Sequence, residues 1–241
     1  MIRPALVADL PAVGVLCRDL GITAPPLHGT LIAESGGTVT GYVRIQPLGH
    51  VGYIRDLVTV DAHLPLMLAA AAALRQAGVR EWHLDVRPQS AAIGIYEQLG
   101  MQPAHRSTAL RFPWARLADL PGESALALPV SVEDADDIER GLDMLGGQVA
   151  MVRRWPNLVL RQLRDDSCAA VGFAALDPAG ARMFRVARPS LAAPLLAALR
   201  PFARHPDLAI VLDDQDALAA LLEMYGAHVV LELLHFSGPL P

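Results

Sequence analysis

The chain of 241 residues contains no lysine, and its only asparagine is Asn157. All 20 basic residues are therefore arginines, a bias typical of a bacterial genome rich in G and C. They are scattered and the net charge is −5, so no nucleic-acid partner is expected. The two cysteines, Cys17 and Cys168, are too few for a disulfide framework or a cysteine metal site. Both lie among apolar residues, which predicts buried free thiols.

Long hydrophobic runs are also missing, although 53% of the residues are hydrophobic. The longest run, LPLMLAAAAAL at 64–74, falls short of the roughly 18 residues that span a membrane, so no membrane partner is expected. Asp9 and Pro11 interrupt the start of the chain, which does not resemble a signal peptide and predicts a cytoplasmic protein. The histidines lack metal-ligand spacing, and the fingerprints of α/β-hydrolases and of dinucleotide-binding proteins are missing, so no metal is expected.

A short phrase occurs twice. IYEQLGM at 95–101 and LLEMYGA at 221–227 lie 126 positions apart, and the same offset aligns the preceding strand and helix patterns. This repeat predicts an N-terminal domain at 1–112, a linker at 113–125 with prolines at 113 and 121, and a C-terminal domain at 126–241. In each half, strands, a helix, a strand and a last helix follow one another. That order predicts the α/β class, with a mixed sheet and helices on both faces.

Hydrophobic periodicity places the elements of the first half. It predicts helices at about 8–19, 64–78 and 91–99, and strands at 29–35, 39–45, 51–60, 81–86 and 105–112. In the second half, Pro201 lies inside the helical pattern at 191–205. Proline removes a backbone hydrogen bond and clashes one turn back, so a kink or an early end is expected there.

The stretch WHLDVRPQSAAIGIYEQLGM at 82–101 resembles the general N-acetyltransferase (GNAT) superfamily. That family has an Asn, an Ala and a Tyr before Leu-Gly-Phe, and this chain has Gln89, Ala92, Tyr96, Leu99, Gly100 and Met101 there. IRDLVTV at 54–60 is similar to the family's fourth strand. The likeness covers nearly all of 1–112 and, more weakly, the chain from 126 onward. It implies two tandem GNAT-like (acyl-CoA N-acyltransferase) units.

The resemblance implies transfer of an acetyl group from acetyl-CoA to an amine of a small molecule or peptide. Tyr96 matches the acid that protonates the leaving thiolate, whereas the second copy has Leu222, which cannot donate a proton. The positions that match the binding site of the pantetheine arm are Leu57, Val58, Thr59 and Val60 on the fourth strand, with Gln89 and Ala92 before the last helix.

The phosphate loop departs from the family pattern. Val60 leads through DAHLP into the helix without a glycine, and Asp61 would repel a pyrophosphate. In the second unit, Arg188 and Ser190 are better suited to hold a phosphate. The general base is not defined by the sequence, and the candidates are Asp56, Glu34 and His50.

Two functions stay open at this point. One is an acetyl-CoA-dependent N-acetyltransferase, which the motif around Tyr96 favours. The other is a non-catalytic GNAT-like protein with a ligand-binding or assembly role, which the short phosphate loops favour. The two units suggest either a monomer with pseudo-dimeric halves or a homodimer.

Overall fold

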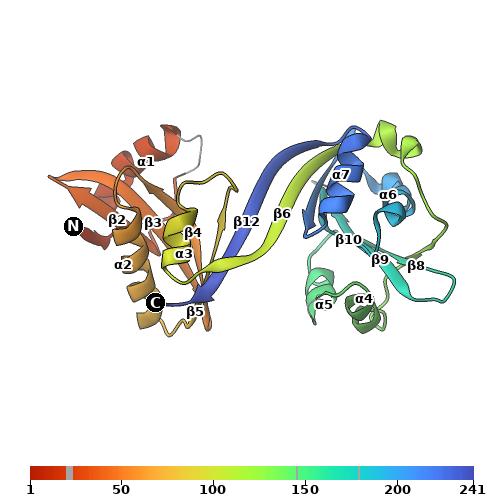
Figure 1. Cartoon of the computed structure of the whole chain (residues 1–241), viewed down its shortest axis with the longest axis horizontal. Coiled ribbons are helices and arrows are strands. Elements are labelled where there is room, and N and C mark those ends of the chain that lie inside the picture. Colours follow the sequence, from red (N-terminus) through yellow and green to blue (C-terminus); the bar gives the residue numbers. More distant parts are fainter. Residues whose placement is uncertain (20–23, 145, 179) are drawn as a thin grey trace. The chain divides into compact units, whose positions relative to one another are not determined.

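The computed structural model describes residues 1–19, 24–144, 146–178 and 180–241. The chain forms two compact units, and six consecutive strands of the sheet order lie largely in each (Figure 1). Unit 1 consists of residues 1–106 and 233–241, and unit 2 consists of residues 107–232. These limits differ from the predicted 1–112, 113–125 and 126–241, which remain a prediction about the duplication. None of the helices in the described part of the chain is long and apolar enough to cross a membrane.

Unit 1 contains a sheet of six strands, in which only β4 and β5 are parallel neighbours. The spatial order is β1 (Ile2–Pro4), β2 (Thr30–Ser35), β3 (Thr38–Leu48), β4 (Val51–Thr59), β5 (Glu81–Val86) and β12 (His228–Pro239). The part of β12 that pairs with β5 runs from Leu234 to Pro239. The last segment of the chain therefore completes the sheet of the first unit.

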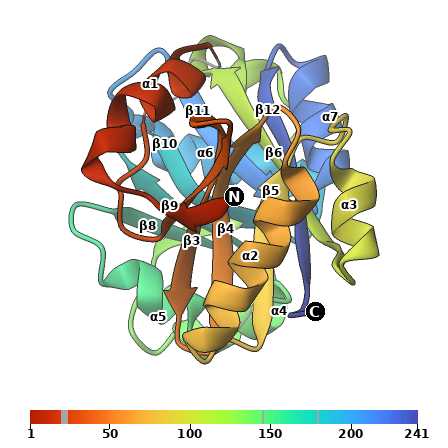
Figure 2. The ribbon, with the colours of Figure 1, turned by 90° about the vertical axis from the view of Figure 1, so that its left-hand side faces the viewer.

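Helices cover both faces of this sheet (Figure 2). After a 3₁₀ turn (Val7–Asp9), α1 (Leu10–Asp19) buries Val13 and Cys17 against Ile32 and Tyr42. The opposite face carries α2 (His63–Gln76) and α3 (Ile93–Gln98), whose apolar side chains surround Trp82. Both helices are followed by glycines with positive φ, 79° at Gly78 and 81° at Gly100, a conformation that glycine adopts without strain.

Unit 2 repeats this plan with the order β6 (Gln102–Pro113), β11 (Asp207–Asp213), β10 (Gly180–Val186), β9 (Ala170–Asp177), β8 (Val159–Arg164) and β7 (Leu126–Pro129). One face carries α4 (Ala135–Gly141) and α5 (Gln148–Arg153), and the other carries α6 (Ala192–Leu199) and α7 (Asp216–Met224). Three 3₁₀ segments complete the unit, Trp114–Asp119, Pro189–Leu191 and Arg200–Phe202. The early helix end expected at Pro201 is confirmed, because α6 stops at Leu199.

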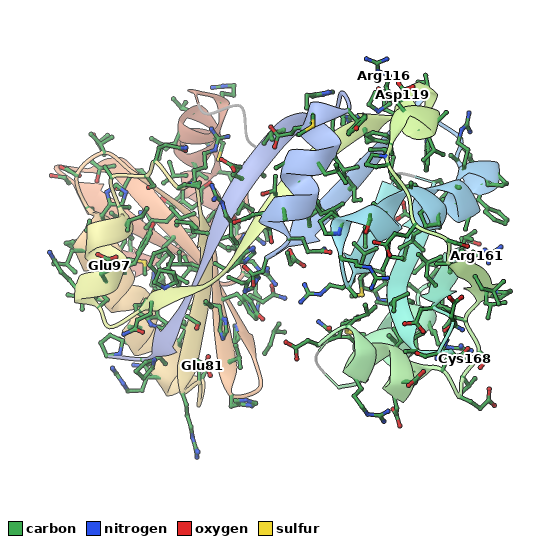
Figure 3. All side chains as sticks on the ribbon, turned by 45° about the vertical axis from the view of Figure 1, so that its right-hand side comes forward. Glu81, Glu97, Arg116, Asp119, Arg161 and Cys168 are labelled. Atoms are coloured by element: carbon green, nitrogen blue, oxygen red, sulfur yellow. The ribbon has the colours of Figure 1, made fainter. Side chains whose placement is uncertain are left out.

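The strand predicted at 105–112 is present as part of β6, which pairs with β11 from Ser107 to Pro113. One sequence prediction is wrong in the structure. Cys168 is exposed instead of buried, because it lies in the turn between β8 and β9 with a φ of 63° (Figure 3).

Candidate active site

Two neighbouring strands of unit 1 diverge. Parallel pairing of β4 with β5 begins at Val51 and Glu81 and ends at Ile54 and Leu84, although β4 continues to Thr59. Next to the end of this pairing, the register between β3 and β4 shifts at Arg55, which marks a β-bulge. A bulge bends its strand and increases the local twist. The bulge therefore accounts for the separation of β4 from β5.

Backbone groups of β4 are left unpaired along the gap. The N–H of Val60 donates to the carbonyl of Thr40 on β3, at 3.1 Å. Because successive residues of a strand direct their backbone groups to opposite neighbours, Leu57 and Thr59 direct theirs toward β5. The pairing with β5 has ended at this point. These groups can therefore bind a ligand that lies along β4.

The gap opens into a pocket of about 600 Å³, a volume typical of small-molecule sites. It is lined from β4 and α2, from β5 and the turn after it, from α3 and from the start of the paired part of β12. The lining residues are Ile54, Arg55, Asp56, Leu57, His63, Leu84, Asp85, Val86, Arg87, Gln89, Ser90, Ala92, Tyr96 and Leu233.

Tyr96 lines the pocket from the α3 side of the sheet. Its side chain is 6% exposed and its ring lies 6.0 Å from that of Phe236. Burial raises the pKa of the phenol, so it stays protonated at neutral pH and can act as a donor. In the described part of the chain, no residue accepts a hydrogen bond from this hydroxyl. Tyr96 belongs to the short helix α3, which positions its side chain. In the turn before this helix, the Ser90 hydroxyl accepts a hydrogen bond from the N–H of Ala92, at 3.3 Å.

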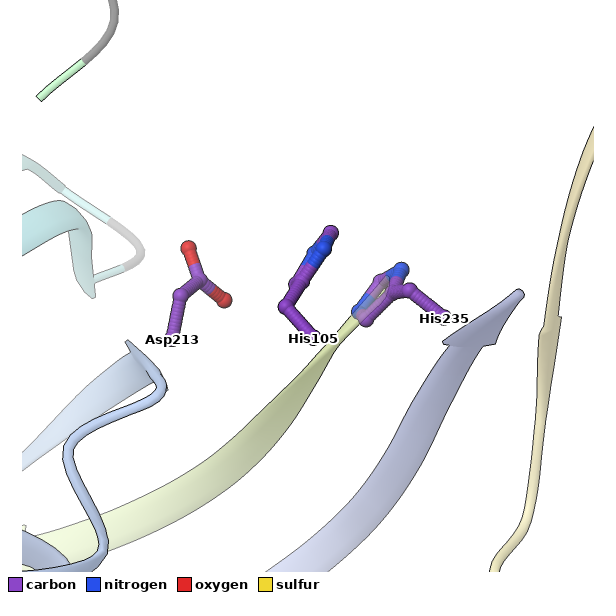
Figure 4. A group of neighbouring side chains, drawn as sticks. All are labelled: His105, Asp213 and His235. Atoms are coloured by element: carbon purple, nitrogen blue, oxygen red, sulfur yellow. The ribbon is translucent and has the colours of Figure 1, made fainter. Parts of the chain in front are cut away.

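Asp85 lines the same pocket from the opposite face. Trp82, Leu84 and Val86 of β5 are buried toward α2 and α3, so the alternating Asp85 points to the other side of the sheet. Its carboxylate lies 2.5 Å from Nδ1 of His235 on β12. The His235 ring stacks on that of His105, with centroids 3.8 Å apart (Figure 4). The Asp85 and His235 pair is thus held at the edge of the pocket.

The sequence analysis missed Asp85, His235 and Arg87. Asp85 could have been found from the sequence EWHLDV, in which the polar residues Glu81, His83 and Asp85 alternate with apolar ones and so share one face of the strand. The labelled Glu81 in Figure 3 starts this polar row, and its carboxylate lies 3.0 Å from His83. His235 could not be assigned to this site without knowing that β12 joins β5.

The pH dependence of stability tests the Asp85 and His235 contact. The hydrogen bond from His235 lowers the pKa of Asp85, against the raising effect of burial. A carboxyl with a lowered folded-state pKa stabilises the fold above its unfolded pKa of about 4, and this stabilisation is lost as the pH falls through the folded value. Asp85→Asn should therefore lower the melting temperature at pH 7, and the loss should shrink as the pH is lowered toward 2. Asp61→Asn, at an exposed position, is the control, and an equal effect of Asp85→Asn at both pH values would contradict the contact.

The predicted base candidates have different positions. Asp56 lines the pocket, but its carboxylate lies 2.5 Å from Nε of Arg44 on β3. Glu34 does not line the pocket and forms an ion pair with Arg3 at 2.9 Å. His50 lies in the turn before β4, at the end of the strand remote from the gap. Of the three, only Asp56 is near the gap.

Of the residues predicted to bind the cofactor, some line the pocket and others do not. Leu57, Gln89 and Ala92 line the pocket. Val58 packs on the α1 side, and Val60 is 80% exposed. The Thr59 hydroxyl accepts the N–H of Ala62 at 2.9 Å, while its backbone faces the gap. Arg188 and Ser190 belong to unit 2, where both contact Glu123, and they do not reach this pocket.

No protein-family model matches the sequence, and no curated protein matches it either. Solved structures do match. A GCN5-related N-acetyltransferase from Sphaerobacter thermophilus covers 100% of this chain and 95% of its own, with a TM-score of 0.63 and 13% identity. A tandem GNAT protein from the clavulanic acid biosynthesis pathway covers 100% and 98%, with a TM-score of 0.52 and 14% identity. A putative acetyltransferase from Pyrococcus horikoshii covers 99% and 89%, with a TM-score of 0.50 and 18% identity. The chain therefore has the tandem GNAT fold that its sequence predicts.

Proposed function

We propose that unit 1 binds acetyl-CoA in the gap between β4 and β5 and transfers the acetyl group to a primary amine. The observation that carries this proposal is the end of the β4–β5 pairing at Ile54 and Leu84, with Tyr96 beside the gap. The backbone groups of Leu57 and Thr59 would bind the amides of the pantetheine arm as a neighbouring strand would. The thioester would then lie between Tyr96 on one face of the sheet and Asp85 on the other.

The chemistry follows from that placement. The amine nitrogen attacks the thioester carbonyl carbon from the Asp85 face, and the carbonyl electron pair moves to oxygen. The tetrahedral intermediate collapses, the C–S bond breaks and the acetyl group stays on nitrogen. Tyr96 gives its proton to the leaving thiolate, while the Asp85 and His235 pair accepts the proton of the amine. This pair replaces Asp56, Glu34 and His50 as the proposed base, because the Asp56 carboxylate is already paired with Arg44.

Arg87 and His63 would hold the phosphates in place of a glycine-rich loop. Both line the pocket, and no residue in the described ranges pairs with the Arg87 guanidinium. Arginine binds phosphate with charge-assisted hydrogen bonds, each worth about 1.5–3 kcal/mol. The exposed Asp61 at the start of α2 would have the opposite effect. The proposed anion site thus combines the first residue of α2 with Arg87, in the turn after β5.

Calorimetric titration with acetyl-CoA tests the binding part of the proposal. One molecule should bind per chain, and Arg87→Ala should raise the dissociation constant about tenfold, as the loss of one charged hydrogen bond predicts. Arg80→Ala removes an arginine that does not line the pocket and should change nothing. No binding to the wild-type chain would contradict the proposal.

A non-catalytic ligand-binding role is the second candidate. The observation that favours it is the helix start after β4, where Asp61 stands and no glycine is present. In this case acetyl-CoA binds, but the CoA thiol is not released when primary amines such as tyramine or spermidine are added. Amine-dependent release of the thiol would rule out this candidate.

A further inference from the structure

The strands of unit 2 that correspond to β4 and β5 also diverge. β10 and β11 are parallel neighbours, and among the residues that the structure describes their pairing consists of Ala181 with Ile210. Beyond that point the N–H of Ala187 donates to Val171 on β9, at 2.9 Å. By the alternation of a strand, Phe184 and Val186 direct their backbone groups to the other side, toward the gap.

The side chain of Gln215 fills this gap. Its Nε2 donates to the carbonyl of Phe184 at 2.8 Å, and its Oε1 accepts the N–H of Val186 at 3.2 Å. The Gln215 carboxamide thus binds the C=O of Phe184 and the N–H of Val186. A backbone amide of a neighbouring strand would make the same two kinds of hydrogen bond. Gln215 directly precedes α7, but its side chain makes no capping bond to that helix.

Unit 1 leaves the same backbone groups open. The bond from Val60 to β3 matches that of Ala187 to β9, 127 positions later, so Thr59 and Leu57 match Val186 and Phe184 along the strand edge. This strand match is one residue longer than the offset of 126 between the last helices. Gln89 stands 126 positions before Gln215, the offset of the repeat. Gln89 is exposed at the pocket and makes no such bond in the described part of the chain. The corresponding strand edges of the two units therefore differ. In unit 2 the side chain of Gln215 binds the backbone of Phe184 and Val186, whereas among the described residues of unit 1 the side chain of Gln89 makes no such bonds.

In unit 2, the carboxylate of Glu123 binds the side chains of Arg188 and Ser190. Nε of Arg188 donates to Glu123 at 2.7 Å, and the Ser190 hydroxyl donates to the same carboxylate. The backbone N–H of Glu123 also donates to the carbonyl of Ser190, at 3.1 Å. The Arg188 and Ser190 contacts lower the pKa of Glu123, so its carboxylate is anionic at neutral pH. Arg188 and Ser190 were the residues predicted to hold a phosphate.

We propose that unit 2 contains a second site for CoA-type ligands, closed by the chain itself. Gln215 stands in for the amide of such a ligand and Glu123 for its phosphate. This inference rests on the function proposed for unit 1, because it assumes that the open edge there binds the same class of molecule. Removing the two side chains frees the Phe184 and Val186 edge and the Arg188 and Ser190 pair.

The test compares CoA stoichiometry in three proteins by calorimetry. The wild-type chain should bind one equivalent, and Gln215→Ala combined with Glu123→Ala should bind two. Gln215→Met combined with Glu123→Ala is the matched control, because methionine fills the gap without making the hydrogen bonds, and it should bind one. Equal stoichiometry in all three proteins would overturn the closed site. The difference between variant and wild type tests this inference, whereas the wild-type value alone tests the function of unit 1.

Hydrogen exchange of the Val186 amide gives a second readout in the variant that combines Gln215→Ala with Glu123→Ala. Loss of the Gln215 acceptor should speed exchange at Val186, and saturating CoA should slow it again in the variant but not change it in the wild type. If CoA leaves Val186 unprotected in the variant, unit 2 has no such site.

Discussion

Tyr96→Phe is expected to lower the rate of acetyl transfer by about a hundredfold or more, the range in which a positioned general acid contributes. The phenol is buried against Phe236 and keeps its proton at neutral pH, so it can donate to a thiolate but not act as a base. Phenylalanine keeps the ring and its packing. The dissociation constant of acetyl-CoA should therefore stay unchanged while turnover falls.

The measurement is the release of the CoA thiol in the presence of a primary amine, together with calorimetric binding. Tyr53→Phe is the control, since Tyr53 stacks on His83 at 5.2 Å and does not line the pocket. An unchanged rate in Tyr96→Phe, at wild-type affinity, would remove Tyr96 from the mechanism. Loss of affinity instead of rate would assign it to binding alone.

Phe236→Ala is expected to destabilise unit 1 by about 3–5 kcal/mol, the usual cost of emptying a buried phenylalanine site. Phe236 is 1% exposed, pairs with Leu84 and packs in the core with Tyr96. A domain is stable by only about 5–15 kcal/mol, so the first unit would be left marginal. Truncation after Glu232 removes the whole paired part of β12 and should have a larger effect.

Hydrogen exchange localises this effect. Protection of the β5 amides, at 81–86, should fall in Phe236→Ala although the substitution lies far away in the sequence. Phe202→Ala is the control, because Phe202 is 41% exposed under Arg161 in unit 2. Unchanged protection of β5 would show that β12 does not complete the first sheet in solution.

Local pattern was enough to predict most elements and the fold. Alternation in EWHLDV predicted β5, and the glycines at 78 and 100 predicted the ends of α2 and α3. Pro201 predicted the end of α6. These features depend on backbone geometry within a few residues, which is what a sequence records most directly.

The site was predicted less completely, for two physical reasons. Gln89, Ala92 and Tyr96 belong to the motif that resembles the GNAT superfamily, and Leu57 belongs to the strand that does so. All four line the pocket. Asp85 and His235 come together only because β12 pairs with β5, and antiparallel edges with similar apolar patterns do not specify their partners. The role of Gln215 was not predicted, because its contacts with Phe184 and Val186 depend on a strand divergence that no local pattern encodes.

The late position of β12 in the chain has a consequence for biosynthesis. A ribosome adds about 5–20 residues per second, so the segment that pairs with β5 is made roughly 7 to 30 s after β5 itself. During that interval the nascent first unit presents an unpaired edge that carries Trp82 and Leu84, the kind of edge that recruits other strands or chaperones. Unit 1, most of which is translated first, can therefore complete its folding only after β12 has been synthesised.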